Sequence, residues 1–523
     1  MSPERSDQAS AERHTGRPGA SSPSWLLRRW FTANALLAGV LALAWLLLRS
    51  GPRPSRLAYP CQRAALSTAT LAFGAPLVAL VVAARRHLAA GLRSPLGAAV
   101  TALVVVLGLA AAGYLVGVDA ADAPLLDPPR DYRAQLFHAV NCPQDPVGDR
   151  FPGLDGLVQL MGAGGLKIYR SATVGPLSGP DGIVAAGDVV IVKINYQWPE
   201  RGGTNTDLLR GLIRIIVDHP DGFTGEVVVC ENTQFAGADG FDRPLNNAQD
   251  HDLSPRDVVD HFAGLGHQVS LMDWTALRFT EVAEYSQGDM ADGYVVYPYD
   301  DQLHGRISYP KFGTGHGSHV SLRDGIWDPA TGYNRERLKV INLPVLKSHH
   351  ATYGATACVK HFMGVVSDSL GTNSHSAIRY GLLGAVMGEV HPPDLNLLDA
   401  VWINADPYDG PSTSYDGATR RDELVAGVDP VALDIWSVTN ILIPAFLDDG
   451  HSPPWPHPEA TPDDPTSDFR VYLDRSMSEL LAAGYDATND LAAIDVVTVD
   501  LSANVFADGF ESGDASAWSA AVP

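Results

Sequence analysis

The stretch Asp188–Asn195, DVVIVKIN, decides the fold class. β-branched residues fill it almost without interruption, which is typical of a strand buried on both faces. Thr204–Val217 follows with apolar residues along one helical face, and Glu226–Cys230 is a second short apolar run. Strand, helix and strand at this spacing predict an α/β fold with a mostly parallel sheet and covering helices.

The same alternation continues along the chain after residue 230. Further elements are expected at Ser254–Gly264 (helix), Val269–Met272 (strand), Leu338–Leu343 (strand), Leu395–Ile403 (strand) and about Pro430 to Leu442 (helix). Residues 287–334 interrupt the alternation of strands and helices with short β-like runs and Gly-rich turns, so we expect a β-rich insertion there.

Three apolar runs near the N-terminus predict a membrane anchor. Trp30–Leu48, Ala64–Ala84 and Leu96–Val118 hold no charged residue, and each approaches the roughly 20 residues that span a bilayer. The arginines between and before these runs favour a cytoplasmic N-terminus and a soluble domain outside the cytoplasm. We therefore expect three transmembrane helices that anchor the protein in a bacterial inner membrane.

Composition limits the partners and cofactors. The chain has a net charge of -23, although residues 1–118 carry twelve Arg and only three acids, so the remainder is strongly acidic. Such a body is a poor partner for nucleic acid. The four cysteines form no C-x-x-C pair, and no iron–sulfur cluster is expected.

These features predict six segments along the chain. They are a basic cytoplasmic tail (1–29), three transmembrane helices (30–118), a linker and irregular lead-in (119–187), the α/β domain (188–445), a C-terminal extension (446–505) and an acidic tail (506–523). The core of the tail, Phe510–Asp514, resembles a C-terminal tag of bacterial surface and secreted proteins.

The stretch from Asn342 to Gly364, NLPVLKSHHATYGATACVKHFMG, carries the strongest chemical signal. It contains Lys347, His349, His350, Lys360 and His361 but no Asp or Glu. Lysines without acidic neighbours, next to paired histidines, suit an anionic ligand, a metal or a carbonyl group to be polarised. The alternative is a surface loop whose lysines point into water.

Other polar residues follow or interrupt the predicted strands. Because ligands bind at the carboxyl ends of parallel strands, Lys193, Asn195 and Glu231 are candidate ligand-binding residues. Two further candidates are Asp399, a carboxylate within an apolar strand that needs a partner, and Asp434, which lies among apolar neighbours in the predicted helix. Histidines are also dense, with His349, His350, His361, His375 and His391 within 43 positions. Histidine is the commonest metal ligand, so His349, His350 and His361 are candidate ligands of a divalent transition metal.

Taken together, the motifs resemble the DUF362 family, a domain of unknown function found in bacteria and archaea. The matching pieces are VVIVKIN, INLPVLKSHHATYGATACVKHFMG, LLDAVWI, Gly410-Pro411 and GVDPVALDIW, in family order across roughly residues 188–440. His361 stands where the family commonly has Asn. The cysteine clusters of many members are missing, so their iron–sulfur chemistry does not carry over.

Three interpretations of the lysine–histidine stretch remain open. In the first, the protein is an enzyme whose histidines bind a metal or move a proton, while the lysines, with Lys347 and Lys360 foremost, hold a small anionic substrate. In the second, it is a non-catalytic surface module that binds a ligand or partner. In the third, the stretch is architectural and Lys360 pairs with Asp399 or Asp434 in the core.

Overall fold

The computed structural model describes residues 125–129, 131–234, 240–249, 253–349, 353–453, 464 and 467–502. The predicted transmembrane helices, His350 and the acidic tail lie outside the described residues.

A ten-stranded, mostly parallel sheet forms the centre of the fold, which confirms the predicted α/β class. Eight strands follow the order β18-β1-β17-β16-β13-β5-β6-β7, and β14 joins β16 and β15. Their bounds are β1 Ala134–Val140, β5 Val189–Lys193, β6 Glu226–Glu231, β7 Val269–Asp273, β13 Leu338–Asn342, β14 Val345–His349, β15 Gly354–Thr356, β16 Leu395–Asn404, β17 Thr419–Gly427 and β18 Ile494–Asp500. Five adjacent strands run parallel to one another, namely β16, β13, β5, β6 and β7. β17 is antiparallel to both β16 and β1.

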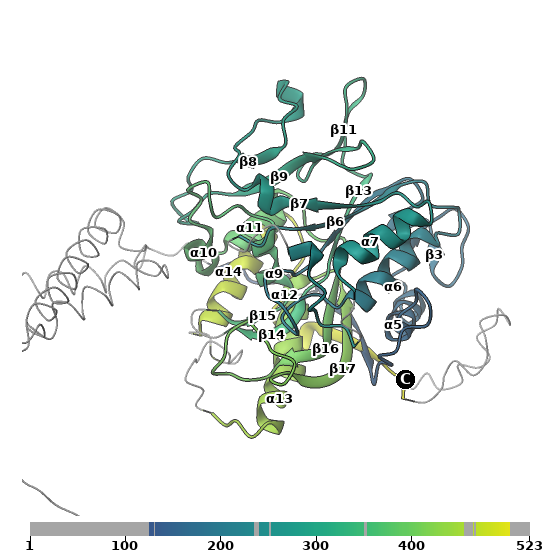
Figure 1. Ribbon diagram of the computed structural model, residues 1–523. Helices are drawn as coiled ribbons and strands as arrows, with labels where there is room; N and C mark the ends of the chain where they lie inside the picture. Colours follow the sequence, from purple (N-terminus) through teal and green to yellow (C-terminus); the bar gives the residue numbers. More distant parts are fainter. Residues whose placement is uncertain are drawn as a thin grey trace, which may run out of the picture. The chain divides into compact units, whose positions relative to one another are not determined.

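Helices cover both faces of the sheet, and alternate residues of β5 show how. Val190 and Val192 belong to the core beneath one helical layer, and Val189 and Ile191 belong to the core beneath the other. The first layer contains α5 Pro152–Ala163, α6 Thr206–Val217 and α7 Pro255–Gly264, which Figure 1 shows grouped together. The second contains α9 Cys358–His361, α11 Leu382–Glu389, α12 Pro430–Ser437 and α14 Asp468–Ala482. This two-sided burial explains why the central strands are uninterrupted apolar runs.

The sheet is wider than the sequence predicted. Residues 119–187 were expected to be an irregular lead-in, but they contain β1 and α5, and the C-terminal extension supplies α14 and β18. β1 pairs with β18 in parallel along its whole length, with Leu136 beside Val496. This pairing joins segments that are far apart in the sequence, so no local pattern in either segment could indicate it.

The expected β-rich insertion is a separate five-stranded antiparallel sheet. Its strands are β8 Gly293–Val296, β9 Ser308–Gly313, β10 His319–Ser321, β11 Gly325–Asp328 and β12 Gly332–Asn334. The remaining short elements are β2 Tyr169–Arg170, β3 Ser178–Gly179, β4 Val184–Ala185, α8 Trp274–Leu277, α10 Ser374–Ala377 and α13 Ile443–Asp448, together with the 3-10 turns η3 Gly240–Asp242, η4 Tyr285–Gln287, η5 Phe362–Gly364, η6 Ile378–Tyr380 and η9 Leu491–Ala493.

One helical stretch in the described part of the chain is long and apolar enough to cross a membrane. It runs from Pro430 to Asp448, through α12, a π-helical turn (η7, Val438–Leu442) and α13, and most of it is buried inside the protein. This stretch therefore behaves as a core helix of the second layer.

Candidate functional site

The carboxyl ends of the central parallel strands bring the predicted residues to one edge of the sheet. In the strand register, Asn342 at the end of β13 lies beside Lys193 at the end of β5, and Lys193 lies beside Cys230 on β6. Glu231 is the next residue of β6. The short helix α9 carries Lys360 and His361 at this edge, and both side chains are buried.

Lys193 and Glu231 form a buried ion pair. Lys193 Nζ lies 2.5 Å from Glu231 Oε2, and it also donates to the carbonyl of Ile194 at 3.0 Å. The turn η5 closes over this pair, because a Cβ on Gly364 would collide with both Lys193 Nζ and Glu231 Oε1. Glycine is therefore required at position 364 by the close approach of the backbone to the pair.

Two further lysines lie beside this pair, and their contacts differ. Lys347 on β14 donates to the carbonyl of Gly202 at 2.5 Å. Lys360 on α9 has its Nζ 4.8 Å from the centroid of the Tyr353 ring. Within the described part of the chain, Lys360 makes no hydrogen bond or ion pair, so its amine has only an aromatic partner.

The field at this site is set by three amines and by the carboxylates of Glu231, Asp399 and Asp368. Burial lowers the pKa of Lys347 and of Lys360 to about 7. The charge of Lys193 acts in the same direction, and that of Glu231 acts in the opposite direction. Burial raises the pKa of Glu231 to about 7 against the opposing effect of Lys193. Near neutral pH these groups therefore exchange protons readily, and an anion would stabilise the charged lysines.

His361 is held as a neutral ring with a defined hydrogen position. Its Nδ1 lies 2.6 Å from Asn342 Oδ1, while the Asn342 amide nitrogen donates to Cys358 O at 3.2 Å and to Asn396 Oδ1 at 2.9 Å. Asn342 therefore accepts from the ring, and Nδ1 carries the hydrogen. Burial, followed by the charges of Lys193 and Lys347, lowers the pKa of His361 well below its usual value. The Ile194 carbonyl favours the protonated ring, but it makes no hydrogen bond to Nε2, which is buried without a partner.

The described residues do not assemble a metal site. Among them, no group of three or more His, Cys, Asp or Glu side chains lies close enough to hold a metal ion. His349 is turned toward Thr356, with Nδ1 2.8 Å from Oγ1, and its ring meets Tyr353 edge-on at 5.0 Å. His350 lies outside the described residues, so the predicted set of three histidines stays a prediction.

Asp434 and Asp399 are occupied by neighbouring groups, and neither pairs with Lys360. The two oxygens of Asp434 accept the backbone N–H groups of Cys358 at 2.6 Å and Val359 at 3.0 Å, which fixes the start of α9. Asp399 accepts from Val401 N at 3.0 Å and from Asn247 Nδ2 at 2.8 Å. The architectural interpretation, in which Lys360 pairs with one of these carboxylates, is therefore wrong.

The burial of these two carboxylates still affects their protonation. Burial raises the pKa of Asp434 to about 7 and that of Asp399 to about 6, against the backbone hydrogen bonds that favour the charged forms. Asn195 is fixed through its backbone, which donates to Thr204 Oγ1 at 2.7 Å at the entry to α6.

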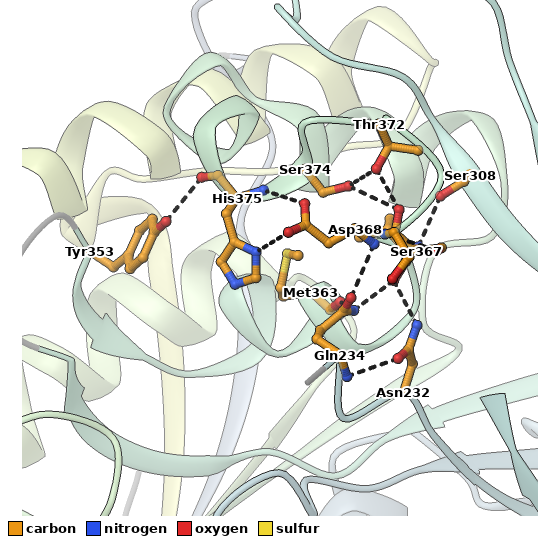
Figure 2. Close-up of polar contacts among 12 residues, drawn as sticks. Asn232, Gln234, Ser308, Tyr353, Met363, Ser367, Asp368, Thr372, Ser374 and His375 are labelled. Atoms are coloured by element: carbon orange, nitrogen blue, oxygen red, sulfur yellow. Dashed lines mark hydrogen bonds and ion pairs between the residues drawn. The ribbon is translucent and has the colours of Figure 1, made fainter. Parts of the chain in front are cut away.

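An Asp–His pair beside Lys360 was not among the predicted site residues. Figure 2 shows Asp368 facing His375, with Asp368 Oδ2 3.1 Å from His375 Nδ1. Tyr353, whose ring contacts Lys360, donates its hydroxyl to the carbonyl of His375 at 2.9 Å. Of the two carboxylates that raise the pKa of Lys360, Asp368 has the larger effect. Asp368 and His375 therefore lie on the Tyr353 side of the lysine site.

Gln234 holds the loop that carries this pair. Its amide nitrogen donates to Met363 O at 2.8 Å and Val366 O at 2.7 Å, and its amide oxygen accepts from Asp368 N at 3.1 Å (Figure 2). A side chain just past the end of β6 thus fixes the loop between η5 and α10. The density of histidines in the sequence was the only signal for His375, and nothing in the sequence indicated Gln234.

Lysine usage is a second signal that the sequence offered. The chain has 31 arginines but only six lysines, at positions 167, 193, 311, 339, 347 and 360. Three of the six meet at this one buried site. Lysine changes its protonation state on burial, whereas arginine stays charged, so this choice favours chemistry that needs an amine.

A cavity at the opposite end of the sheet is a weaker candidate. It has a volume of about 310 Å³ and lies at the start of β13, where Arg335, Lys339, His391 and Asp394 line it. Its charges are already satisfied, since Lys339 Nζ lies 3.3 Å from Asp394 and Arg335 donates to Val390 O. We therefore place the functional site at the carboxyl edge of the sheet.

Comparison with known proteins gives a family match over part of the chain. Residues 335–439 match DUF362, a domain of unknown function. This range includes β13, β14, α9, α12 and the lysine–histidine stretch, which agrees with the resemblance over that part of the chain, whereas VVIVKIN at residues 189–195 lies outside the match. No curated protein and no solved structure matches the chain.

Proposed function

We propose that this DUF362-containing protein binds a small anion, a carboxylate or phosphate compound, at the lysine site, and acts on it by proton transfer. The observation that carries the proposal is the gathering of Lys193, Lys347 and Lys360 around Glu231 in a buried site. Buried charges are normally balanced, and an excess of ammonium groups costs free energy unless a ligand supplies the missing negative charge.

Several groups at the site are suited to proton transfer at neutral pH. The pKa values of Glu231, Lys347 and Lys360 each lie at about 7, close to the pH at which a general acid or base works best. The proposal assigns no metal to His361, because the ammonium groups around it would repel a divalent cation. Elemental analysis of protein purified with nickel and zinc supplied tests this point, and a stoichiometric metal lost in His361→Ala would contradict it.

We further propose that residues 30–118 anchor the protein in a bacterial inner membrane, with the α/β domain outside the cytoplasm. The uncharged apolar runs and the arginine distribution support this topology. Protease treatment of spheroplasts tests it: the domain should be degraded from outside. Protection of the domain in intact spheroplasts would contradict the orientation.

Calorimetric titration of the purified protein with phosphate and with pyruvate tests the anion site. Affinity should be higher at pH 6 than at pH 9, because Lys347 and Lys360 are protonated only at the lower pH. Lys360→Met should weaken binding about tenfold, the effect of losing one charged contact of about 1.4 kcal/mol.

The matched control is Lys311→Met. Lys311 is also buried over a tyrosine ring, at 4.1 Å from the Tyr285 centroid, but it lies in the β-rich insertion. This variant should bind both anions like the parent. Absence of binding in the parent, or equal binding by the parent and Lys360→Met, would refute the proposed site.

A further inference from the structure

We propose that Lys360 is a nucleophile that forms an imine with the carbonyl carbon of an anionic carbonyl compound, of the 2-oxo acid class. The inference rests on the proposed anion site and specifies its chemistry. It assigns different roles to the three lysines, and their contacts justify the division.

Lys360 is the lysine whose nitrogen is free to react. Lys193 is bound to Glu231, and Lys347 donates to Gly202, whereas among the described residues the Lys360 amine has no polar partner and lies over the face of Tyr353. Lys360 is also the most accessible of the three, at 6% exposure against 1% for each of the others. A deprotonated Lys360 would therefore present an unblocked lone pair to a bound substrate.

The surroundings favour the neutral amine that the reaction needs. Desolvation and a second ammonium group are the two conditions that activate a lysine toward carbonyl carbon. Both conditions are present, because Lys360 is buried and the positive charge of Lys193 lowers its pKa. The use of lysine rather than arginine at all three positions also fits, since arginine would hold an anion equally well but could not form an imine.

The step balances with groups at the site. The Lys360 nitrogen forms a bond to the carbonyl carbon, the carbonyl oxygen leaves as water, and both amine hydrogens end in that water. Lys193 and Lys347 would hold the substrate carboxylate through their charges.

Reductive trapping tests the inference directly. The purified protein is incubated with pyruvate or glyoxylate, treated with sodium borohydride, and digested for peptide mapping by mass spectrometry. With only six lysines in the chain, every candidate site can be mapped. We expect one reduced adduct on Lys360, suppressed by excess phosphate, and none in Lys360→Arg.

Two controls separate this result from nonspecific modification and from failure of the anion site. Lys167, which is not buried and contacts only the carbonyls of Gly175 and Pro176, reports random trapping. Lys360→Arg keeps a positive charge and should still bind phosphate. An adduct confined to Lys167, or none with either compound while phosphate still binds, would overturn the imine and leave the anion site standing. Loss of phosphate binding in the parent would instead overturn the proposed function.

Discussion

Replacing Lys360 by Met should stabilise the protein, and the gain should depend on pH. Met fills most of the space of the lysine stem without its charge. The pKa of Lys360 falls from 10.5 to about 7 on folding. At about 1.36 kcal/mol per tenfold change in proton affinity, the protonated amine costs about 5 kcal/mol, an upper limit because the site can relax.

The direction of this pH dependence follows from the number of protons bound by the folded and unfolded states. Below pH 7 the amine is protonated in both folded and unfolded states, so the full cost is present. Between pH 7 and 10.5 the unfolded state binds more protons, and the stability of the parent rises with pH. The advantage of Lys360→Met should therefore be largest at pH 6 and nearly absent at pH 10.5.

Urea denaturation of parent and variant at pH 6, 8 and 10.5 measures this difference. Lys311→Met is the matched control, because Lys311 donates to Asp289 O at 2.7 Å and its removal loses that bond. It should therefore destabilise the protein or leave its stability unchanged. If Lys360→Met instead lowers the free energy of unfolding by a few kcal/mol at pH 6, Lys360 has a favourable buried partner and the reasoning fails.

Three further predictions concern the groups around Lys360. Lys193→Met should destabilise the protein by about 3–5 kcal/mol at pH 8, because it leaves the buried charge of Glu231 without its partner. The loss of stability should be smaller at pH 5, where Glu231, with its pKa raised to about 7, is protonated. Adding Glu231→Gln to the same chain should restore stability in urea denaturation. Asp434→Ala should cost about 1–3 kcal/mol by the same measurement, since two backbone N–H groups of α9 lose their acceptor, and an unchanged midpoint would show that Asp434 does not hold the helix. Gly364→Ala should cost about 1–3 kcal/mol and weaken phosphate binding in calorimetry, whereas Gly187→Ala, whose added Cβ meets nothing within 4 Å, should do neither.

Much of the fold could be predicted from the sequence because the central strands are buried on both faces. The apolar runs that became β5, β6 and β13 could be assigned from composition and length alone. The edge strands β1 and β18 could not, because their pairing depends on contacts between segments more than 350 positions apart. Long-range pairing leaves no local signal, and the Gly- and Pro-rich neighbourhood of β1 suggested irregular structure instead.

Part of the lysine site could also be predicted from the sequence, because two of its residues end central strands. Lys193 and Glu231 end neighbouring strands, so a parallel sheet brings them together whatever the loops do. The roles of Asp399 and Asp434 could not be predicted. The sequence does not distinguish a buried carboxylate that accepts backbone N–H groups from one that faces a ligand. Asp368 and His375 meet only because the chain reverses through Gly371 (φ 68°) and Asn373 (φ 57°), a local geometry that no periodicity reveals.

The most direct test of the account is the titration of its lysines by NMR. Selective carbon-13 labelling of lysine gives six side-chain signals to follow with pH, and Lys347→Arg and Lys360→Arg assign the two that matter. The account predicts that these two titrate near pH 7, and that added phosphate moves both midpoints upward. Ordinary midpoints near 10.5 for both lysines, unchanged by phosphate, would contradict the claim that buried, mutually repelling amines form an anion site.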